Sequence, residues 1–110
     1  MTDVNGGDDG ALGAVEAVPD PSGALVIKLS GEIDISNADR IGAELERLVG
    51  DRTVPLVVDL SDLGFMDSSG IAMLLQTVTR LDSVAVRNPS DVMRRMIDAT
   101  GLADVLPAED

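Results

Sequence analysis

Two kinds of hydrophobic pattern alternate along the chain. Apolar and polar residues alternate in Ala24–Ser30, which is typical of a strand with one buried face, and an almost continuous apolar run in Val54–Leu60 is typical of a strand buried on both faces. After Ser36, Ser69 and Asn88, apolar residues instead recur every three or four positions, as they do in amphipathic helices. The pattern therefore predicts strands and helices in alternation.

Two shorter segments complete the predicted order of elements. Ala14–Val18 and Ser83–Arg87 each favour a short strand, and the turn signal Pro19–Gly23 joins the first of them to Ala24–Ser30 as an antiparallel hairpin. Strand–helix–strand connections later in the chain give parallel neighbours. We therefore predict an α/β fold with the order β-β-α-β-α-β-α, in which helices pack on a small mixed β-sheet.

Boundary residues predict where these elements begin and end. We expect loops over Gly31–Ile35 and Ser61–Met66, and Ser36 as the N-cap of the first helix. The second helix is predicted over Ser69–Leu81, and the third over Asn88–Thr100 with the asparagine as its cap.

The folded domain is predicted to occupy residues 14–106. Residues 1–13 are polar, acidic and without hydrophobic periodicity, so we expect a disordered tail, and residues 107–110 form a short C-terminal tail. Gly101 is expected to end the third helix, and Val105 to reach a last short strand or turn.

Composition narrows the classes of function. The 110 residues carry eight basic and twenty acidic side chains, a formal charge of −12, and Phe65 is the only aromatic residue, so the core must be aliphatic. A nucleic-acid binder needs a basic face, and an anionic membrane would repel this chain, whereas a basic protein partner is compatible with it. With neither Cys nor His, the chain has no thiol nucleophile, imidazole base or zinc site.

No targeting or membrane segment is visible in the sequence. The N-terminus lacks a basic stretch followed by an apolar one, and no apolar run approaches the length that spans a bilayer. We expect a soluble cytoplasmic protein that does not insert into membranes.

The stretch Asp67-Ser68-Ser69-Gly70 joins a predicted strand to a predicted helix and allows two interpretations. The common one is plain capping, because Asp and Ser side chains accept hydrogen bonds from the unpaired N–H groups of a helix start. In the other, one serine faces solvent and is phosphorylated. The helix dipole would tolerate the added charge, while a docked partner would be repelled by it.

An enzymatic interpretation uses the same end of the sheet. Ser68 does not lie in a G-x-S-x-G motif, and the only lysine, Lys28, lies in mid-strand, so a serine nucleophile lacks a base. A small hydrolase or phosphotransferase with Mg²⁺ would instead need acidic residues to cluster at one sheet edge. The candidates are Glu32, Asp34, Asp59, Asp62 and Asp67.

Three stretches of the chain are specific enough to compare with a known family. They are LSGEIDISNADRI at Leu29–Ile41, LVVDLSDLGFMDSSGIAMLL at Leu56–Leu75 and NPSDVMRRMIDATGLADVL at Asn88–Leu106. They resemble the STAS domain, and specifically the bacterial anti-sigma factor antagonists, over the range from Leu25 to Leu106. The FMDSSG segment is the most specific of these.

The resemblance implies a regulatory binding module rather than an enzyme. In the family, an anti-sigma factor with serine kinase activity phosphorylates the position of Ser68. The unphosphorylated form binds that partner and releases a sigma factor, and a phosphatase resets the switch. ATP and magnesium are then expected on the kinase partner, and no cofactor on this chain. The implied partner surface comprises Gly31, Glu32, Ile33, Asp34, Asp67, Ser68, Ser69, Gly70 and Met73.

An alternative within the same family stays open. A STAS domain can also serve as a subunit of a stress-signalling assembly or as an accessory of a membrane lipid transporter, without regulating a sigma factor. The same serine motif occurs there, so sequence separates the two roles poorly.

Overall fold

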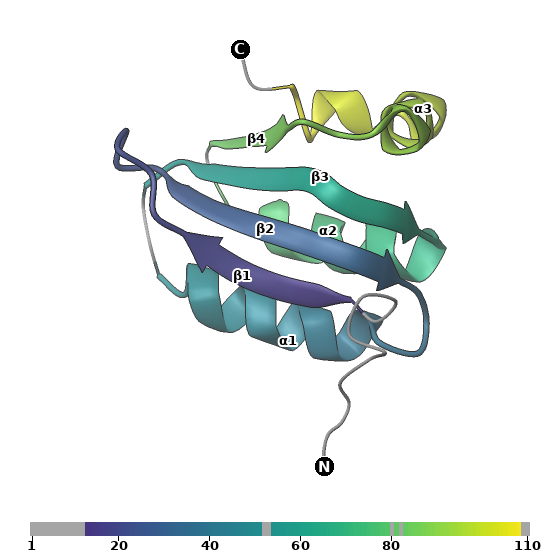
Figure 1. Cartoon of the computed structure of the whole chain (residues 1–110), viewed down its shortest axis with the longest axis horizontal. Helices are drawn as coiled ribbons and strands as arrows, with labels where there is room; N and C mark the ends of the chain where they lie inside the picture. The colour runs from purple at the N-terminus through teal and green to yellow at the C-terminus, as the bar shows by residue number, and fades with distance from the viewer. Residues whose placement is uncertain (1–12, 52–53, 80, 82, 109–110) are drawn as a thin grey trace.

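A four-stranded mixed sheet with helices on one face forms the fold in the computed structural model, which describes residues 13–51, 54–79, 81 and 83–108 (Figure 1). Apart from Gly13, the predicted acidic tail lies outside these residues. The strands are β1 (Ala14–Val18), β2 (Leu25–Ile33), β3 (Leu56–Met66) and β4 (Val84–Arg87), and the helices are α1 (Ala38–Val49), α2 (Ser68–Val78) and α3 (Asp91–Thr100). This order confirms the predicted fold class.

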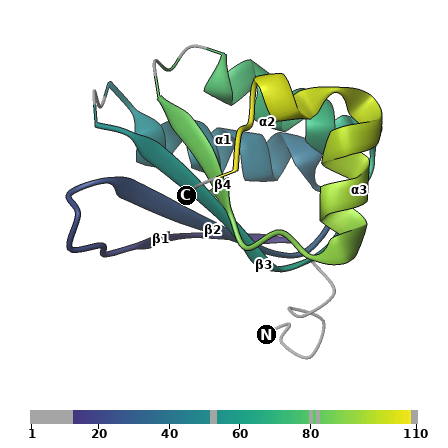
Figure 2. The same ribbon diagram turned by 90° about the horizontal axis from the view of Figure 1, so that it is seen from above.

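The strands lie in the order β1-β2-β3-β4, with β1 antiparallel to β2 and the other pairs parallel. The helices α1 and α2 cover one face of the sheet, and α3 packs beside β3 beyond the end of the short β4 (Figures 1 and 2). The core between the layers is built from aliphatic and methionine side chains, as expected for a chain whose one aromatic residue, Phe65, is partly exposed. Its fully buried members include Ile27, Leu29, Leu45, Leu60 and Leu74.

Both central strands are longer than predicted. The expected loops over Gly31–Ile35 and Ser61–Met66 are wrong, because β2 continues to Ile33 and β3 to Met66. The pairing of β2 with β3 shifts register twice, between Lys28 and Ser30 and between Gly31 and Glu32, with an extra residue on β3 each time. The buried residues of β3 therefore recur every third position near its end, which hides the strand in the sequence.

The predicted helix boundaries also need correction. Asn37, not Ser36, precedes α1, because the Ser36 hydroxyl instead donates to the Asp34 carboxylate. Ser90 rather than Asn88 caps α3, its hydroxyl accepting from the Met93 N–H at 3.2 Å. The helix α2 spans Ser68–Val78, where the sequence predicted Ser69–Leu81.

Beyond α3 the chain returns to the sheet. Gly101 ends α3 in the left-handed region at φ 75°, as predicted, and a 3₁₀ turn follows over Leu102–Asp104. The Val86 N–H then donates to the Pro107 carbonyl at 2.8 Å, and Val86 forms a parallel bridge with Ala108. Two residues of the predicted C-terminal tail thus pair with β4. No helix in the described part of the chain is both long and apolar enough to cross a bilayer.

The sheet face turned away from α1 and α2 carries a row of alternating charge. Glu16, Lys28, Asp59 and Arg87 are direct cross-strand neighbours on β1, β2, β3 and β4. The Lys28 ammonium lies 2.8 Å from the Asp62 carboxylate. The hydrogen bond to Asp62, and then the charges of Asp62, Asp59 and Glu16, raise the pKa of Lys28. Opposite charges on adjacent strands favour this register over a slipped one.

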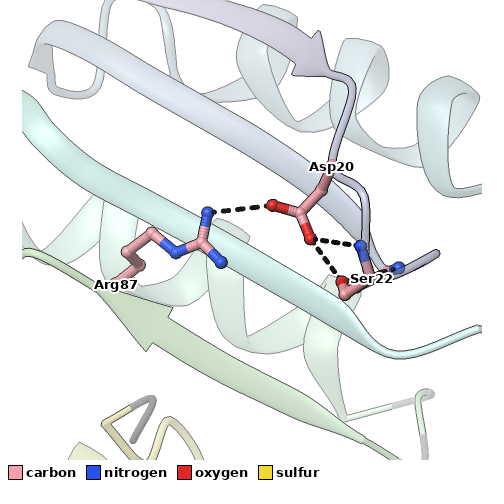
Figure 3. Close-up of polar contacts among 4 residues, drawn as sticks. Asp20, Ser22 and Arg87 are labelled. Carbon is pink, nitrogen blue, oxygen red and sulfur yellow. Dashed lines mark hydrogen bonds and ion pairs between the residues drawn. The ribbon is translucent and has the colours of Figure 1, made fainter.

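One ion pair on this face spans the sheet. Arg87 on β4 extends across β3 toward Asp20, in the turn before β2, with 3.5 Å between guanidinium and carboxylate (Figure 3). The other carboxylate oxygen of Asp20 accepts hydrogen bonds from the Ser22 hydroxyl and N–H. The Ser22 bonds and then Arg87 lower the pKa of Asp20. The ion pair thereby links the turn between β1 and β2 to the edge strand β4.

Replacing Asp20 should change how stability depends on pH. The pKa of Asp20 is lower in the folded chain than in the unfolded chain, where it is about 3.9. Ionised Asp20 therefore stabilises the fold at pH values above the unfolded-state pKa. This stabilisation is lost as the pH falls through the folded-state pKa. We expect Asp20→Asn to lower the free energy of unfolding at pH 7 and to flatten its decline between about pH 5 and pH 3. Urea denaturation across this range measures both.

Two further variants sharpen this test. Arg87→Gln should reproduce only part of the effect, since the Ser22 bonds remain. Asp98→Asn, which removes an exposed carboxylate on α3, is the control. A wild-type pH profile for Asp20→Asn would contradict the role given to this carboxylate.

Candidate functional site

Ser68 is the first residue of α2 and is exposed. The preceding residue, Asp67, has extended backbone and supplies the cap: its Oδ1 accepts from the N–H of Ser69 at 2.8 Å and of Gly70 at 3.2 Å. Of the two interpretations of this motif, capping therefore describes the aspartate, and it does not use the Ser68 hydroxyl.

The surroundings of Ser68 suit an added phosphate. Within the described ranges, no hydrogen-bond partner holds its hydroxyl. The helix start provides a positive dipole end, which favours negative charge there. A phosphoryl group on Ser68 would thus leave the cap of α2 in place and would point into solvent.

The residues after Ser68 face inward to different degrees. Ser69 is half-buried and lines a groove between α1 and α2. Gly70 is buried, and a Cβ there would lie 2.3 Å from Met66 Cγ and 2.9 Å from Ile33 Cγ2. Met73 is only 8% exposed, at the bottom of the same groove. Gly70 therefore lets α2 pack closely on the sheet, and Met73 packs toward Gly42 of α1, so both serve packing more than they present a surface.

The Gly31–Asp34 segment lies beside this motif, as the resemblance implied. The Asp67 N–H donates to the Ile33 carbonyl at 3.1 Å, which joins the end of β2 to the start of α2. Glu32 is exposed and Asp34 half-buried, whereas the side chain of Ile33 is fully buried and cannot touch a partner. Gly31 sits at a register shift of β2 with φ 79°, a conformation that favours glycine.

Asn37 organises this loop, and the sequence reasoning missed it. Its side-chain amide donates to the Glu32 carbonyl at 2.9 Å, and its Oδ1 accepts from the Asp34 N–H at 2.9 Å. The Ser36 hydroxyl and N–H bond the Asp34 carboxylate and lower the pKa of Asp34. Asparagine directly before a helical pattern was the signal that pointed to such a role.

Two large apolar side chains near Ser68 also escaped the sequence reasoning. Ile35 is 82% exposed in the loop before α1, and Phe65 is 43% exposed near the end of β3, where its backbone pairs with Glu32. Hydrophobic periodicity does not report exposure within a loop or past a bulge, so neither residue stood out.

The acidic residues proposed for magnesium do not come together. Asp62 pairs with Lys28, Asp34 binds Ser36, and Asp67 caps α2. In the part of the chain that the structure describes, no three acidic side chains are grouped closely enough to hold a metal ion.

Comparison with known proteins identifies the family. The family model for the STAS domain matches residues 16–110, nearly the whole folded part of the chain. The chain belongs to the STAS domain family. This confirms the resemblance drawn from the sequence motifs.

Relatives of this STAS domain are named as anti-sigma factor antagonists. It is 36% identical over 83 residues to the anti-sigma F factor antagonist of Lysinibacillus sphaericus, with 71% of each chain covered. Its fold matches the crystal structure of an anti-sigma factor antagonist from Mycobacterium paratuberculosis, with a TM-score of 0.76, 30% identity and coverage of 89% of this chain and 86% of that one.

A second structural match concerns a modified protein. The phosphorylated form of the Bacillus cell fate determinant SpoIIAA matches with a TM-score of 0.63 and 26% identity over 88% of this chain and 92% of that one. That relative therefore carries phosphate on the same fold.

Asp67 caps α2 and the Ser68 hydroxyl does not, which predicts a contrast between substitutions of these two neighbours. Asp67→Ala removes the only cap acceptor of α2 that we identify in the described residues and should lower the free energy of unfolding by about 1 kcal/mol. Ser68→Ala should change it by less than about 0.5 kcal/mol. Thermal and urea denaturation compare the two, and an equal loss in both variants would mean that the serine shares the capping role.

Close packing at Gly70 predicts a second contrast. Overpacking costs about 1–3 kcal/mol, whereas the better helix propensity of alanine returns only about 1 kcal/mol. Gly70→Ala should therefore destabilise the domain by up to about 2 kcal/mol, measured by urea denaturation. Gly64→Ala is the matched control, because a Cβ there meets its nearest neighbour at an ordinary 3.7 Å. A neutral Gly70→Ala variant would show that Met66 can move aside.

Proposed function

We propose that this STAS domain is an anti-sigma factor antagonist controlled by phosphorylation of Ser68. In its unphosphorylated form it binds an anti-sigma factor that has serine kinase activity, and so releases a sigma factor. The kinase partner switches it off by phosphorylating Ser68, and a phosphatase resets it. The observation that carries the proposal is the exposed Ser68 hydroxyl at the start of α2, left out of a cap that Asp67 provides.

Electrostatics explains how one phosphoryl group can act as a switch. The phosphate adds close to two negative charges at neutral pH, next to Asp67 and near Glu32 and Asp34 at the end of β2. The fold tolerates this charge, because it sits at a helix N-terminus and replaces no structural hydrogen bond. A partner surface that docks here would have to desolvate the dianion beside these carboxylates, so binding weakens.

In this proposal the chain itself performs no chemistry. The partner supplies ATP and magnesium, and the chain supplies the acceptor hydroxyl. Glu32, Asp34, Asp67 and Ser69 surround that hydroxyl as the contact surface, with the main chain of Gly31 behind them. The buried residues Ile33, Gly70 and Met73 support this surface from beneath. Such a partner implies a cytoplasmic location.

Incubation with kinase-type anti-sigma factors from the same genome and Mg·ATP tests the proposal. Intact-mass measurement should show the gain of one phosphoryl group in the wild type and in Ser69→Ala and Ser36→Ala, and none in Ser68→Ala. Ser69→Ala and Ser36→Ala are the matched controls, because they remove other hydroxyls from the same end of the molecule.

Binding measurements complete this test. Ser68→Ala should bind the kinase partner as tightly as the wild type, and Ser68→Asp should bind about tenfold more weakly, since it places a charge at the docking surface. Phosphate on another residue, or equal binding by Ser68→Asp, would overturn the assignment of the switch. Capture of transporter subunits instead of a kinase would favour the alternative role within the family.

A further inference from the structure

A groove of about 420 Å³ runs between α1 and α2 and opens next to the Ser68 site. The two helices lie side by side behind the sheet (Figure 1). At one end of the groove lie Ile35 and Ser69, and toward the other the Thr77 hydroxyl donates to the Glu46 carboxylate at 3.3 Å, from α2 to α1. The groove thus extends away from the phosphoacceptor along both helices.

Small residues create this groove. Gly42 of α1 faces Met73 of α2 so closely that a Cβ on Gly42 would lie 2.7 Å from Met73 Cγ. Ala43 and Ala72, on facing sides, are exposed and leave the space above this contact open. The bottom is therefore apolar, while a larger residue at either alanine would fill the space.

The charged side chains that line the groove in the described part of the chain are acidic. They are Asp39 and Glu46 of α1, and no described lysine or arginine lies among the lining residues. The whole chain carries a formal charge of −12, so a second copy would meet the same acidic side chains and be repelled. A segment that combines an apolar side chain with basic residues complements both the bottom and the rim.

The position of the groove connects it with the switch. Ser69 lines its wall, directly after Ser68, and Ile35 stands at its mouth with 82% of its surface exposed. An exposed apolar side chain next to an open groove with an apolar bottom is a typical anchor point of a protein interface. The mouth and Ser68 thus lie at the same end of α2, so one partner can contact both.

We infer that the α1–α2 groove is a second docking element for the kinase partner, which inserts a segment with an apolar side chain flanked by lysine or arginine. This inference rests on the proposed function. The groove and Ser68 then have separate roles: the groove contributes affinity for the kinase partner, and Ser68 carries the phosphorylation state. Groove contacts therefore affect the KM for phosphorylation of Ser68. The rate of phosphoryl transfer, kcat, depends on Ser68 and the partner's active site.

A substitution that fills the groove tests the inference. Ala43→Arg should weaken binding of the anti-sigma factor kinase that phosphorylates the wild-type chain by at least about tenfold. It should raise KM for phosphorylation of Ser68 by a similar factor with little change in kcat. Ala99→Arg is the matched control, because it places the same side chain on an exposed position of α3, away from the groove.

A second pair of variants tests the charge. Asp39→Lys reverses one acidic side chain of the groove, and Asp91→Lys makes the same change in the first turn of α3. Both variants lose the same favourable interaction with a helix dipole, so a difference in partner affinity between them is due to the position of Asp39 in the groove. We expect only Asp39→Lys to weaken binding, by about threefold to tenfold, and to reduce its salt dependence.

The outcomes separate this inference from the proposed function. Single phosphorylation of Ser68 together with wild-type binding by Ala43→Arg and Asp39→Lys would overturn the groove and leave the switch intact. A change in self-association of these variants by sedimentation velocity, with unchanged partner binding, would overturn it in favour of a second copy. If no kinase-type anti-sigma factor of the genome binds the wild type, the proposed function fails and this inference fails with it.

Discussion

The hydrogen bonds of Asp67 join three parts of the molecule at one point. Its N–H donates to the Ile33 carbonyl at the end of β2, and its carboxylate accepts from the N–H groups of Ser69 and Gly70 in the first turn of α2. Because Asp67 directly follows β3, one residue sets the start of α2 relative to both central strands. The position and exposure of Ser68 depend on this arrangement, and so does every functional proposal made for the domain.

Packing beneath this point restricts it further. Gly70 brings α2 within van der Waals distance of Met66 and Ile33, which are themselves fully buried at the ends of β3 and β2. On the other side, Asn37 holds the loop before α1 through the main chain of Glu32 and Asp34. Ser68 thus stands on a closely packed base, between a loop that carries carboxylates and a groove lined by small residues. A modification there changes the surface without requiring the core to move.

The stability of the sheet is organised away from this site. The charged row from Glu16 to Arg87 and the Asp20–Arg87 pair lie on the face opposite the helices. The turn that contains Asp20 precedes the N-terminal end of β2, whereas Asp67 binds Ile33 at its C-terminal end. Substitutions on the open face should therefore alter stability and its pH dependence while leaving the surface around Ser68 unchanged.

The sequence alone determined the order of elements, the aliphatic core and the Asp-Ser-Ser-Gly motif at the start of α2, because periodicity and residue type are local properties. It failed where pairing between distant segments decided the outcome. The two register shifts carry β3 on to Met66, and hydrogen bonding places Asn37 and Ser90 directly before α1 and α3 in place of the predicted caps Ser36 and Asn88. Only the tertiary structure decided that Ile33 is buried, that Ile35 and Phe65 are exposed and that α1 and α2 leave a groove beside Ser69. These features depend on which surfaces meet across the fold, and a linear pattern of polar and apolar residues does not contain that information.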